Sequence, residues 1–322
     1  MPFFLRRRAP VSGKGRLYKE KKKSINTASS QPEALETTMT ENSFVFTLSC
    51  EDRPGIVASV SAELYGIGAN IAESNQFWDR QTNRFFMRIA FTCPGDVTRA
   101  QVELALKRPS ERFGMETLLV AGDQKPKILI MVSKFDHAML HLLYQIRVGW
   151  LSAEVVAIVS NHEDSRATAI HEGIPFHYLP VTAATKAERE RDLLTLVEET
   201  GAELVVLARY MQVLSDDLSN RLSGRIINIH HSFLPSFKGA KPYHQAHERG
   251  VKLIGATAHY VTADLDEGPI IEQETERATH AMTAEDLLAT GRDIESRVLA
   301  RAVKHHLERR VLLNGRKTVV FA

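Results

Sequence analysis

The hydrophobic pattern of residues 43–120 alternates between β-rich runs and helical spacing. The first run, Phe44–Leu48, predicts a strand that ends in a turn at Pro54-Gly55. A helix follows, because apolar residues recur there at i, i+4, i+8 and i+11: Ile56, Val60, Leu64 and Ile67. The rest of this part predicts two strands, a helix and a strand, near residues 69–78, 84–92, 97–112 and 116–120. This order indicates a βαββαβ unit of ferredoxin-like type.

A different pattern begins after Gly122–Pro126, a segment with the composition of a linker. Four short, nearly continuous apolar runs predict strands buried on both faces: Ile128–Val132, Val155–Val159, Leu204–Leu207 and Ile226–Ile229. Helical stretches such as Ala138–Arg147 and Ala187–Thr200 separate them. Strands of this kind that alternate with helices indicate a doubly wound, mostly parallel sheet of Rossmann-like type, so we expect an α/β protein.

The last part of the chain predicts a further pair of strands and a closing helix. The strands, Leu253–Val261 and Pro269–Thr275, are expected to pair antiparallel. The helix is expected over about Ala284–Leu313, with one apolar side: Leu287, Ile294, Val298, Ala302 and Leu307. The predicted organisation is therefore an extension at 1–42, a first domain at 43–121, a linker at 122–126 and a second domain at 127–322.

Composition places the chain among ordinary soluble globular proteins. It has 322 residues, 43% of them apolar and 25% charged, which fits about two domains. Residues 1–38 hold nine Lys or Arg and three Glu, a net charge of +6, so the overall +2 leaves −4 on the remainder. With a net charge of −4, the part of the chain after residue 38 does not produce the positive electrostatic potential that attracts nucleic acid. No run of 18 apolar residues exists to span a membrane. Neither kind of partner is expected.

The basic extension has three interpretations. The first is a disordered leader or an upstream start codon, with Met39 as the alternative start; the second is an organelle transit peptide, and the third is a polyanion-binding arm. We favour the first, because the Lys-Glu-Lys-Lys-Lys stretch at Lys19–Lys23 breaks the amphipathic pattern of a transit peptide. The two cysteines, Cys50 and Cys93, are too few for a disulfide framework. We therefore expect a cytoplasmic protein, with organelle import through residues 1–38 as the alternative.

Several common cofactor motifs are missing from the sequence. Gly66–Ile71 approaches the dinucleotide fingerprint but lacks its third Gly and follows a helix, so we interpret it as a helix end. No phosphate-binding Gly-x4-Gly-Lys loop and no Gly-x-Ser-x-Gly elbow occur. The pairs His230-His231 and His305-His306 are not a metal signal, since strand neighbours point to opposite faces and neither pair has i, i+4 spacing.

The most informative stretch begins at the carboxyl end of the predicted strand at 226–229. It reads Asn228-Ile-His230-His-Ser-Phe-Leu-Pro-Ser-Phe-Lys-Gly-Ala-Lys-Pro-Tyr-His, and open α/β sheets bind ligands at that edge. Asn228 and His230 are two residues apart, so both side chains project to the same side of an extended backbone. This pair suits an acyl carbonyl. The amide can hold an oxyanion, by about 3–4 kcal/mol, and the imidazole can move protons near neutral pH.

A second stretch, His259–Ile271, reads as a strand, an acidic turn and another strand. An acidic residue of this turn is a candidate to orient His230 or to take a proton from an attacking water. The candidates are Asp264, Asp266 and Glu267. Acidic residues before Gly-Pro are also ordinary turn residues, so the residues alone leave the choice open.

Together these stretches resemble the folate-dependent formyltransferase family, which includes glycinamide ribonucleotide and methionyl-tRNA formyltransferases. The shared motifs are Asn-x-His with Ser-x-Leu-Pro, then His-x-Val-Thr-x-x-Leu-Asp-x-Gly-Pro-Ile, within about Lys127–Val311. The resemblance implies that Asn228, His230 and Asp266 are the catalytic residues. Those that it assigns to substrate binding are Arg209, Tyr210, Met211, Val213 and His259.

Departures from the transferases indicate one branch of this family. The strand at 128–132 runs into Ser133–His137, without the Gly-rich loop that cradles a phosphate in the ribonucleotide enzymes. The closing helix ends this chain where the tRNA enzymes have a further domain. The βαββαβ unit, with Asp52-Arg-Pro-Gly55 and Gly68-Ala-Asn70-Ile, resembles an ACT regulatory domain. This combination resembles the formyltetrahydrofolate deformylases, although Ala138 stands where many of them have Cys.

The resemblance implies a hydrolase that acts on a linear amide C–N bond. It would convert 10-formyltetrahydrofolate to tetrahydrofolate and formate, supply formate to purine biosynthesis and balance one-carbon folate pools. The folate is then the small-molecule substrate, no metal or other cofactor is needed, and a homo-oligomer is expected. The ACT-like unit implies an amino-acid effector near Asp52, Gly55 and Asn70, or else serves oligomerisation alone.

Two other functions remain as alternatives. A transferase would use the same three catalytic residues with an amine acceptor, and the missing phosphate loop argues against it. A non-enzymatic regulator that binds folate or an amino acid would tolerate a broken site, whereas Asn228, His230 and Asp266 are all present.

Overall fold

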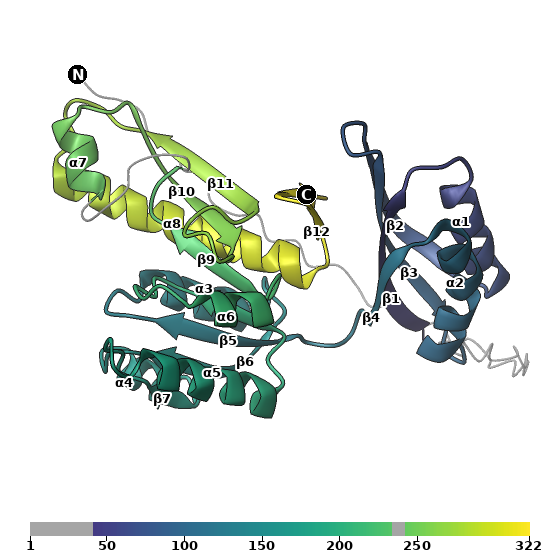
Figure 1. The fold of residues 1–322 in the computed structure, drawn as a ribbon, viewed down its shortest axis with the longest axis horizontal. Helices are drawn as coiled ribbons and strands as arrows, with labels where there is room; N and C mark the ends of the chain where they lie inside the picture. The colour runs from purple at the N-terminus through teal and green to yellow at the C-terminus, as the bar shows by residue number, and fades with distance from the viewer. Residues whose placement is uncertain (1–40, 234–241) are drawn as a thin grey trace, which may run out of the picture. The chain divides into compact units, whose positions relative to one another are not determined.

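The computed structural model describes residues 41–233 and 242–322. The basic extension lies outside these residues except for Glu41 and Asn42, which are the first two residues of a strand. The part of the Asn228–His244 motif at 234–241 also lies outside them. The described chain forms a four-stranded sheet, a seven-stranded sheet and a two-stranded hairpin (Figure 1).

The first sheet and its helices confirm the ferredoxin-like prediction. In chain order the elements are β1 (Glu41–Glu51), α1 (Ile56–Gly66), β2 (Asn70–Asp79), β3 (Arg84–Pro94), α2 (Arg99–Phe113) and β4 (Glu116–Ala121). The strands pair antiparallel in the order β2-β3-β1-β4. Both helices pack on one face of this sheet, where α1 buries Val60 and Leu64 and α2 buries Val102 and Leu106. The periodic apolar positions are thus the core of this unit.

The second sheet confirms the doubly wound, mostly parallel prediction. Its elements are β5 (Lys127–Val132), α3 (His137–Arg147), β6 (Glu154–Ser160), α4 (Arg166–His171), β7 (Phe176–Tyr178), α5 (Lys186–Thr200), β8 (Leu204–Leu207), α6 (Asp216–Arg221), β9 (Ile226–His230), α7 (Pro242–Glu248), β10 (Leu253–Tyr260), β11 (Ile270–Arg277) and α8 (Ala284–Leu307). The strand order is β11-β10-β9-β8-β5-β6-β7. Strands β5 to β9 pair parallel, and β10 and β11 add an antiparallel edge.

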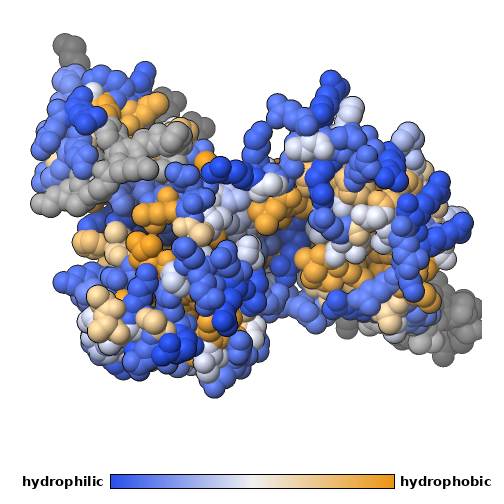
Figure 2. Space-filling model, viewed as in Figure 1, coloured by the Kyte–Doolittle hydropathy of each residue, from blue (hydrophilic) through white to orange (hydrophobic). Residues whose placement is uncertain are grey.

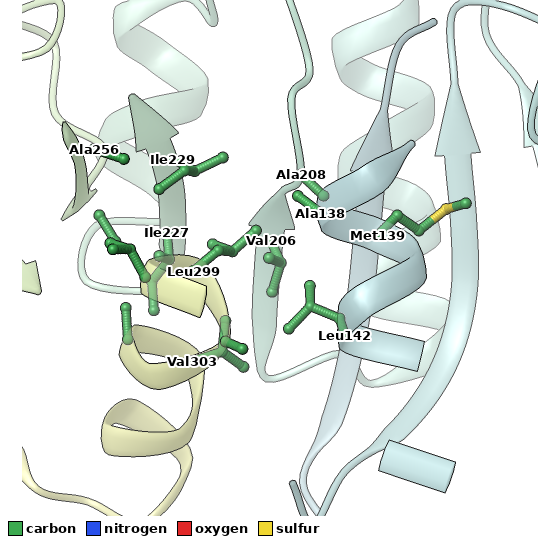
Figure 3. Packing of buried hydrophobic residues seen from close by; sticks show 14 of the residues in the cluster. Ala138, Met139, Leu142, Val206, Ala208, Ile227, Ile229, Ala256, Leu299 and Val303 are labelled. Atoms are coloured by element: carbon green, nitrogen blue, oxygen red, sulfur yellow. The ribbon is translucent and has the colours of Figure 1, made fainter. Parts of the chain in front are cut away.

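Helices cover both faces of the seven-stranded sheet. On one face α3 and α8 pack on the strands, and on the other α5 and α6 do so. Figure 3 shows Leu299 of α8 beside Ile227 of β9, and Leu142 of α3 beside Val206 of β8. Ala138 is fully buried in the same cluster, so this position contributes to packing. The strand order reverses between β5 and β8, and at that point open α/β sheets form their ligand crevice.

The closing helix is shorter than predicted. It ends at Leu307, six residues before the expected end, because the chain turns into a hairpin of β12 (Val311–Asn314) and β13 (Lys317–Val320). The sequence signal was Asn314-Gly315, a dipeptide typical of hairpin loops. The prediction of helix to Leu313 was wrong because the apolar residues at 311–313 continue the helical spacing by chance.

Hydrophilic residues predominate on the face shown in Figure 2, with apolar patches between them, as is normal for a folded protein surface. In the part of the chain that the structure describes, no helix combines the length and apolar character needed to cross a bilayer.

Candidate active site

A pocket of about 350 Å³ opens at the carboxyl ends of β8 and β9 and is bordered by the turn between β10 and β11. The structure places there all eight residues that the formyltransferase resemblance implicated: Arg209, Tyr210, Met211, Val213, Asn228, His230, His259 and Asp266. Three separate segments of the chain thus contribute to one site.

Asn228 and His259 are direct cross-strand neighbours of β9 and β10. The His259 Nδ1 lies 2.9 Å from the Tyr260 carbonyl oxygen, which can only accept, so Nδ1 donates the hydrogen bond. The other ring nitrogen, Nε2, then faces the Asn228 amide nitrogen at 3.4 Å and accepts from it. This arrangement orients the Asn228 amide and leaves its second N–H for a ligand.

His230 and Asp266 form the second pair of the site. The His230 Nδ1 lies 3.2 Å from Asp266 Oδ2, and the second oxygen, Oδ1, lies 3.7 Å from the His259 Nε2. The hydrogen bond from His230, and after it the influence of the nearby His259 ring, hold the pKa of the Asp266 carboxyl well below its usual range. Asp266 is therefore an ionised carboxylate that accepts a hydrogen bond from the His230 Nδ1–H. The buried His230 Nε2 has no hydrogen-bond partner among the described residues.

The backbone of the acidic turn is tightly constrained. Asp266 has a φ of 58°, in the left-handed region that few residues other than glycine adopt. Two residues later, a Cβ added at Gly268 would lie 1.7 Å from the Tyr260 carbonyl oxygen and 3.2 Å from His259 Nδ1. Only glycine fits at 268, and its close approach fixes the turn that carries Asp266.

The geometry separates the three acidic candidates of this turn. Asp266 contacts His230, Asp264 lines the pocket but is exposed, and Glu267 is exposed and pairs with Arg316 at 3.5 Å. Of the three, Asp266 is the one with an ion pair to His230.

His231 departs from its prediction. We expected His230 and His231 to point to opposite faces, but their rings stack with centroids 4.9 Å apart and planes at 20°. The expectation was wrong because β9 ends at His230, so His231 lies beyond the extended backbone. Burial, then the charge of Arg209 and the neighbouring His230, lowers the pKa of His231 to about 4. His231 is therefore neutral near pH 7.

Two residues important for the pocket were missed by sequence reasoning. Ser133, directly after β5, donates to Asn161 at 2.7 Å and accepts from the Met211 backbone N–H at 3.0 Å, so it holds the pocket wall. Glu295 of α8 is buried and pairs with Arg209. The sequence could have indicated Glu295, because it lies two i+4 steps after Leu287 and so falls on the apolar side of the helix. A charged side chain buried there requires a partner.

The residues implied for an effector site lie apart within one chain. Asp52 follows the end of β1 that pairs with Arg84, and Gly55, with a φ of 94°, precedes α1. Asn70 begins β2 opposite Thr92. From Arg84 to Thr92 along β3 the distance is about 26 Å at the usual rise of a strand. An amino acid is much shorter than this distance, so one such molecule does not contact Asp52 and Asn70 of the same chain.

Comparisons with known proteins follow the same division of the chain. A formyl transferase family model matches residues 126–303, and an ACT domain model matches residues 42–119. The formyltetrahydrofolate deformylase of Bacillus subtilis (strain 168) is 49% identical over 276 residues, which are 85% of this chain and 92% of that protein. This chain belongs to the formyltetrahydrofolate deformylase family.

Solved structures extend the deformylase likeness to three dimensions. The crystal structure of formyltetrahydrofolate deformylase from Burkholderia mallei ATCC 23344 matches with a TM-score of 0.84 and 52% identity, and covers 87% of this chain and 100% of that one. Glycinamide ribonucleotide transformylase 1 from Symbiobacterium toebii matches with a TM-score of 0.58 and 28% identity, over 63% of this chain and 97% of its own. The likeness to the deformylase thus covers much more of this chain.

Proposed function

We propose that this protein hydrolyses 10-formyltetrahydrofolate to tetrahydrofolate and formate. The observation that carries the proposal is the match to named deformylases, at 49% identity for the Bacillus subtilis protein, over a span that includes both matched domains. The pocket supports it, because it combines an oriented amide with an imidazole held by a carboxylate. These are the groups that acyl hydrolysis requires.

The first step of the proposed mechanism is attack by water. With Nδ1 donating to Asp266, neutral His230 has its lone pair on Nε2, where it takes a proton from water as the water oxygen bonds to the formyl carbon. A carboxylate with a strongly lowered pKa is itself a weak base, so Asp266 assists this transfer through His230 by stabilising the imidazolium.

The second step is stabilisation of the tetrahedral intermediate. The free N–H of Asn228 donates to the oxyanion that forms from the formyl oxygen, and the His230 imidazolium adds a positive charge beside it. His259 serves here as a support, because its Nε2 fixes the direction of the Asn228 amide.

The third step is departure of the folate amine. The bond between the formyl carbon and N10 breaks, and N10 takes the proton that His230 Nε2 received from water, since an arylamine anion leaves poorly. The products are tetrahydrofolate and formic acid, which ionises to formate. Each step uses water and protein groups, and the oxidation state of carbon does not change, so we propose no metal or redox cofactor.

A formate-release assay on the full chain tests this function. With 10-formyltetrahydrofolate alone we expect one formate for each tetrahydrofolate formed, and no increase when glycinamide ribonucleotide is added. Turnover that requires an amine acceptor would overturn the proposal and make the protein a transferase. That alternative is not favoured, because relatives of 40–50% identity over most of the chain are deformylases by name.

We also propose that the ACT domain binds an amino-acid effector between two chains, at Asp52 and Gly55 of one chain and Asn70 of the other. Sedimentation and formate release with and without each common amino acid test this proposal. We expect one amino acid to change both the rate and the mass. If none changes either, the domain serves assembly alone.

We propose a reducing compartment, the cytoplasm, as the place of action. Cys50 and Cys93 are both free and buried. Cys93 pairs with Asn42 and Cys50 pairs with Phe85, at opposite ends of β1 and β3, so no disulfide joins them within the chain.

A further inference from the structure

Glu295 is a buried carboxylate that joins three elements around the active site. Its side chain is 1% exposed and contacts His137 Nε2 at 2.8 Å, the Tyr243 hydroxyl at 2.8 Å and Arg209 Nε at 3.3 Å. These partners begin α3, lie in α7 and follow β8, respectively. Burial of a charge costs several kcal/mol unless partners compensate it, so this site is organised around Glu295.

Helix α8 is adapted to this arrangement one turn before Glu295. A Cβ added at Gly291 would lie 2.1 Å from the Tyr243 ring, so glycine lets the ring pack on the helix and its hydroxyl reach Glu295. Burial alone would raise the pKa of Glu295, but the His137 hydrogen bond and the Arg209 charge outweigh it and lower the pKa. Glu295 is therefore charged at neutral pH.

Arg209 connects this carboxylate to the pocket. Its φ of 64° lies in the left-handed region, where a residue other than glycine costs about 1 kcal/mol or more. This conformation turns the chain from β8 into the pocket wall at Arg209–Leu214. Such strain persists only when the surroundings hold it, and the Arg209 side chain, 13% exposed, forms an ion pair with Glu295, although its Nε makes no hydrogen bond to the described residues.

We propose that Glu295 is a positioning residue for folate binding, whose carboxylate holds the Arg209 side chain and thereby the left-handed turn that shapes the pocket wall. Glu295 does not itself line the pocket, and none of its three contacts is Asn228, His230 or Asp266. Its role is therefore in binding more than in the chemical step. This inference rests on the proposed hydrolysis of 10-formyltetrahydrofolate.

The test compares Glu295→Gln with Tyr243→Phe in the full chain. Glu295→Gln removes the charge that holds Arg209, and we expect KM to rise about 10-fold or more while kcat stays within about threefold. Isothermal titration with tetrahydrofolate is expected to give the same rise in Kd. Tyr243→Phe is the matched control, because it removes one hydrogen bond of Glu295 and leaves Arg209 paired, so KM is expected within about twofold of the original.

A second pair of variants separates positioning from general support of the fold. Glycine adopts the left-handed conformation without strain, so in an Arg209→Gly background we expect Glu295→Gln to change KM less than about twofold. An equal rise in both backgrounds would overturn the proposal, as would an unchanged KM in Glu295→Gln alone.

Two further outcomes remain informative. If Glu295→Gln yields no folded protein, Glu295→Asp takes its place, because the shorter side chain keeps the charge but moves it away from Arg209. The proposal is then overturned by an unchanged KM in Glu295→Asp alone, or by an equal rise of KM in the original and the Arg209→Gly backgrounds. If the original protein releases no formate, the proposed function fails, and the titration with tetrahydrofolate still measures the effect of Glu295 on binding.

Discussion

His230 Nδ1 and Asp266 Oδ2 lie 3.2 Å apart, although one residue ends a central strand and the other occupies a left-handed turn. The strand supplies a rigid imidazole, and the turn, fixed by Gly268 against the Tyr260 carbonyl, supplies the carboxylate at a defined place. The pair leaves His230 Nε2 without a hydrogen-bond partner among the described residues, and in the proposed mechanism this nitrogen exchanges protons with water and N10.

Replacement of Asp266 by Asn is expected to lower kcat at least about 100-fold, because the uncharged amide no longer stabilises the His230 imidazolium. Formate release at saturating substrate measures this effect. Glu267→Gln is the control on the same turn, since Glu267 is exposed and pairs with Arg316, and it is expected to retain normal activity. An Asp266→Asn variant with more than about a tenth of the activity would contradict the assigned role.

Replacement of Asn228 by Ala is expected to lower kcat about 100- to 1,000-fold, the loss typical of one oxyanion donor. KM is expected to change little, because the free N–H gains its full strength only when the oxyanion forms. Steady-state formate release gives both constants. The exposed Asn220→Ala of α6 controls for the change of residue type. Retention of more than about a tenth of kcat would argue against the oxyanion role.

Replacement of Gly268 by Ala is expected to reduce activity at least about 10-fold and to lower the thermal midpoint, because the new Cβ forces the turn away from the Tyr260 carbonyl. Gly66→Ala is the matched control, since a Cβ there meets no atom within 4 Å and the φ is not positive. A Gly268→Ala variant with normal kcat would show that the turn tolerates displacement.

Acid is expected to destabilise the fold through His231. Its pKa is about 4 in the folded protein and near 6.5 when unfolded, so between these values the unfolded state binds more protons. The free energy of unfolding therefore falls as pH decreases from 6.5 toward 4, by about 2 kcal/mol at pH 5. Thermal midpoints at pH 7 and pH 5 test this, and His231→Asn is expected to show a smaller decrease. Equal decreases in both proteins would refute the assignment.

Much of the fold was predictable because burial dictates the apolar pattern. Continuous runs such as Ile128–Val132 and Leu204–Leu207 are strands covered by helices on both faces, and the spacing of Val60 and Leu64 is the buried face of α1. The hairpin at β12 and β13 was missed because four-residue strands carry little periodicity.

The site was predictable in part. The spacing of Asn228 and His230 indicated a shared side of one strand, and both line the pocket. The choice of Asp266 over its neighbours needed the turn conformation, and the orientation of Asn228 by His259 needed the register of β9 with β10. Both depend on contacts between distant segments, which local pattern does not encode.

The separation of Asp52 from Asn70 along β3 has a consequence for the effector binding proposed above. A small molecule that must contact both ends of the sheet is completed only by a second chain, so its binding and the association of chains are linked equilibria. The effector then strengthens association by the same factor by which association strengthens effector binding. For an effector bound in the proposed way, dilution of the protein alone is expected to weaken the response, so that the protein concentration sets the sensitivity to the effector.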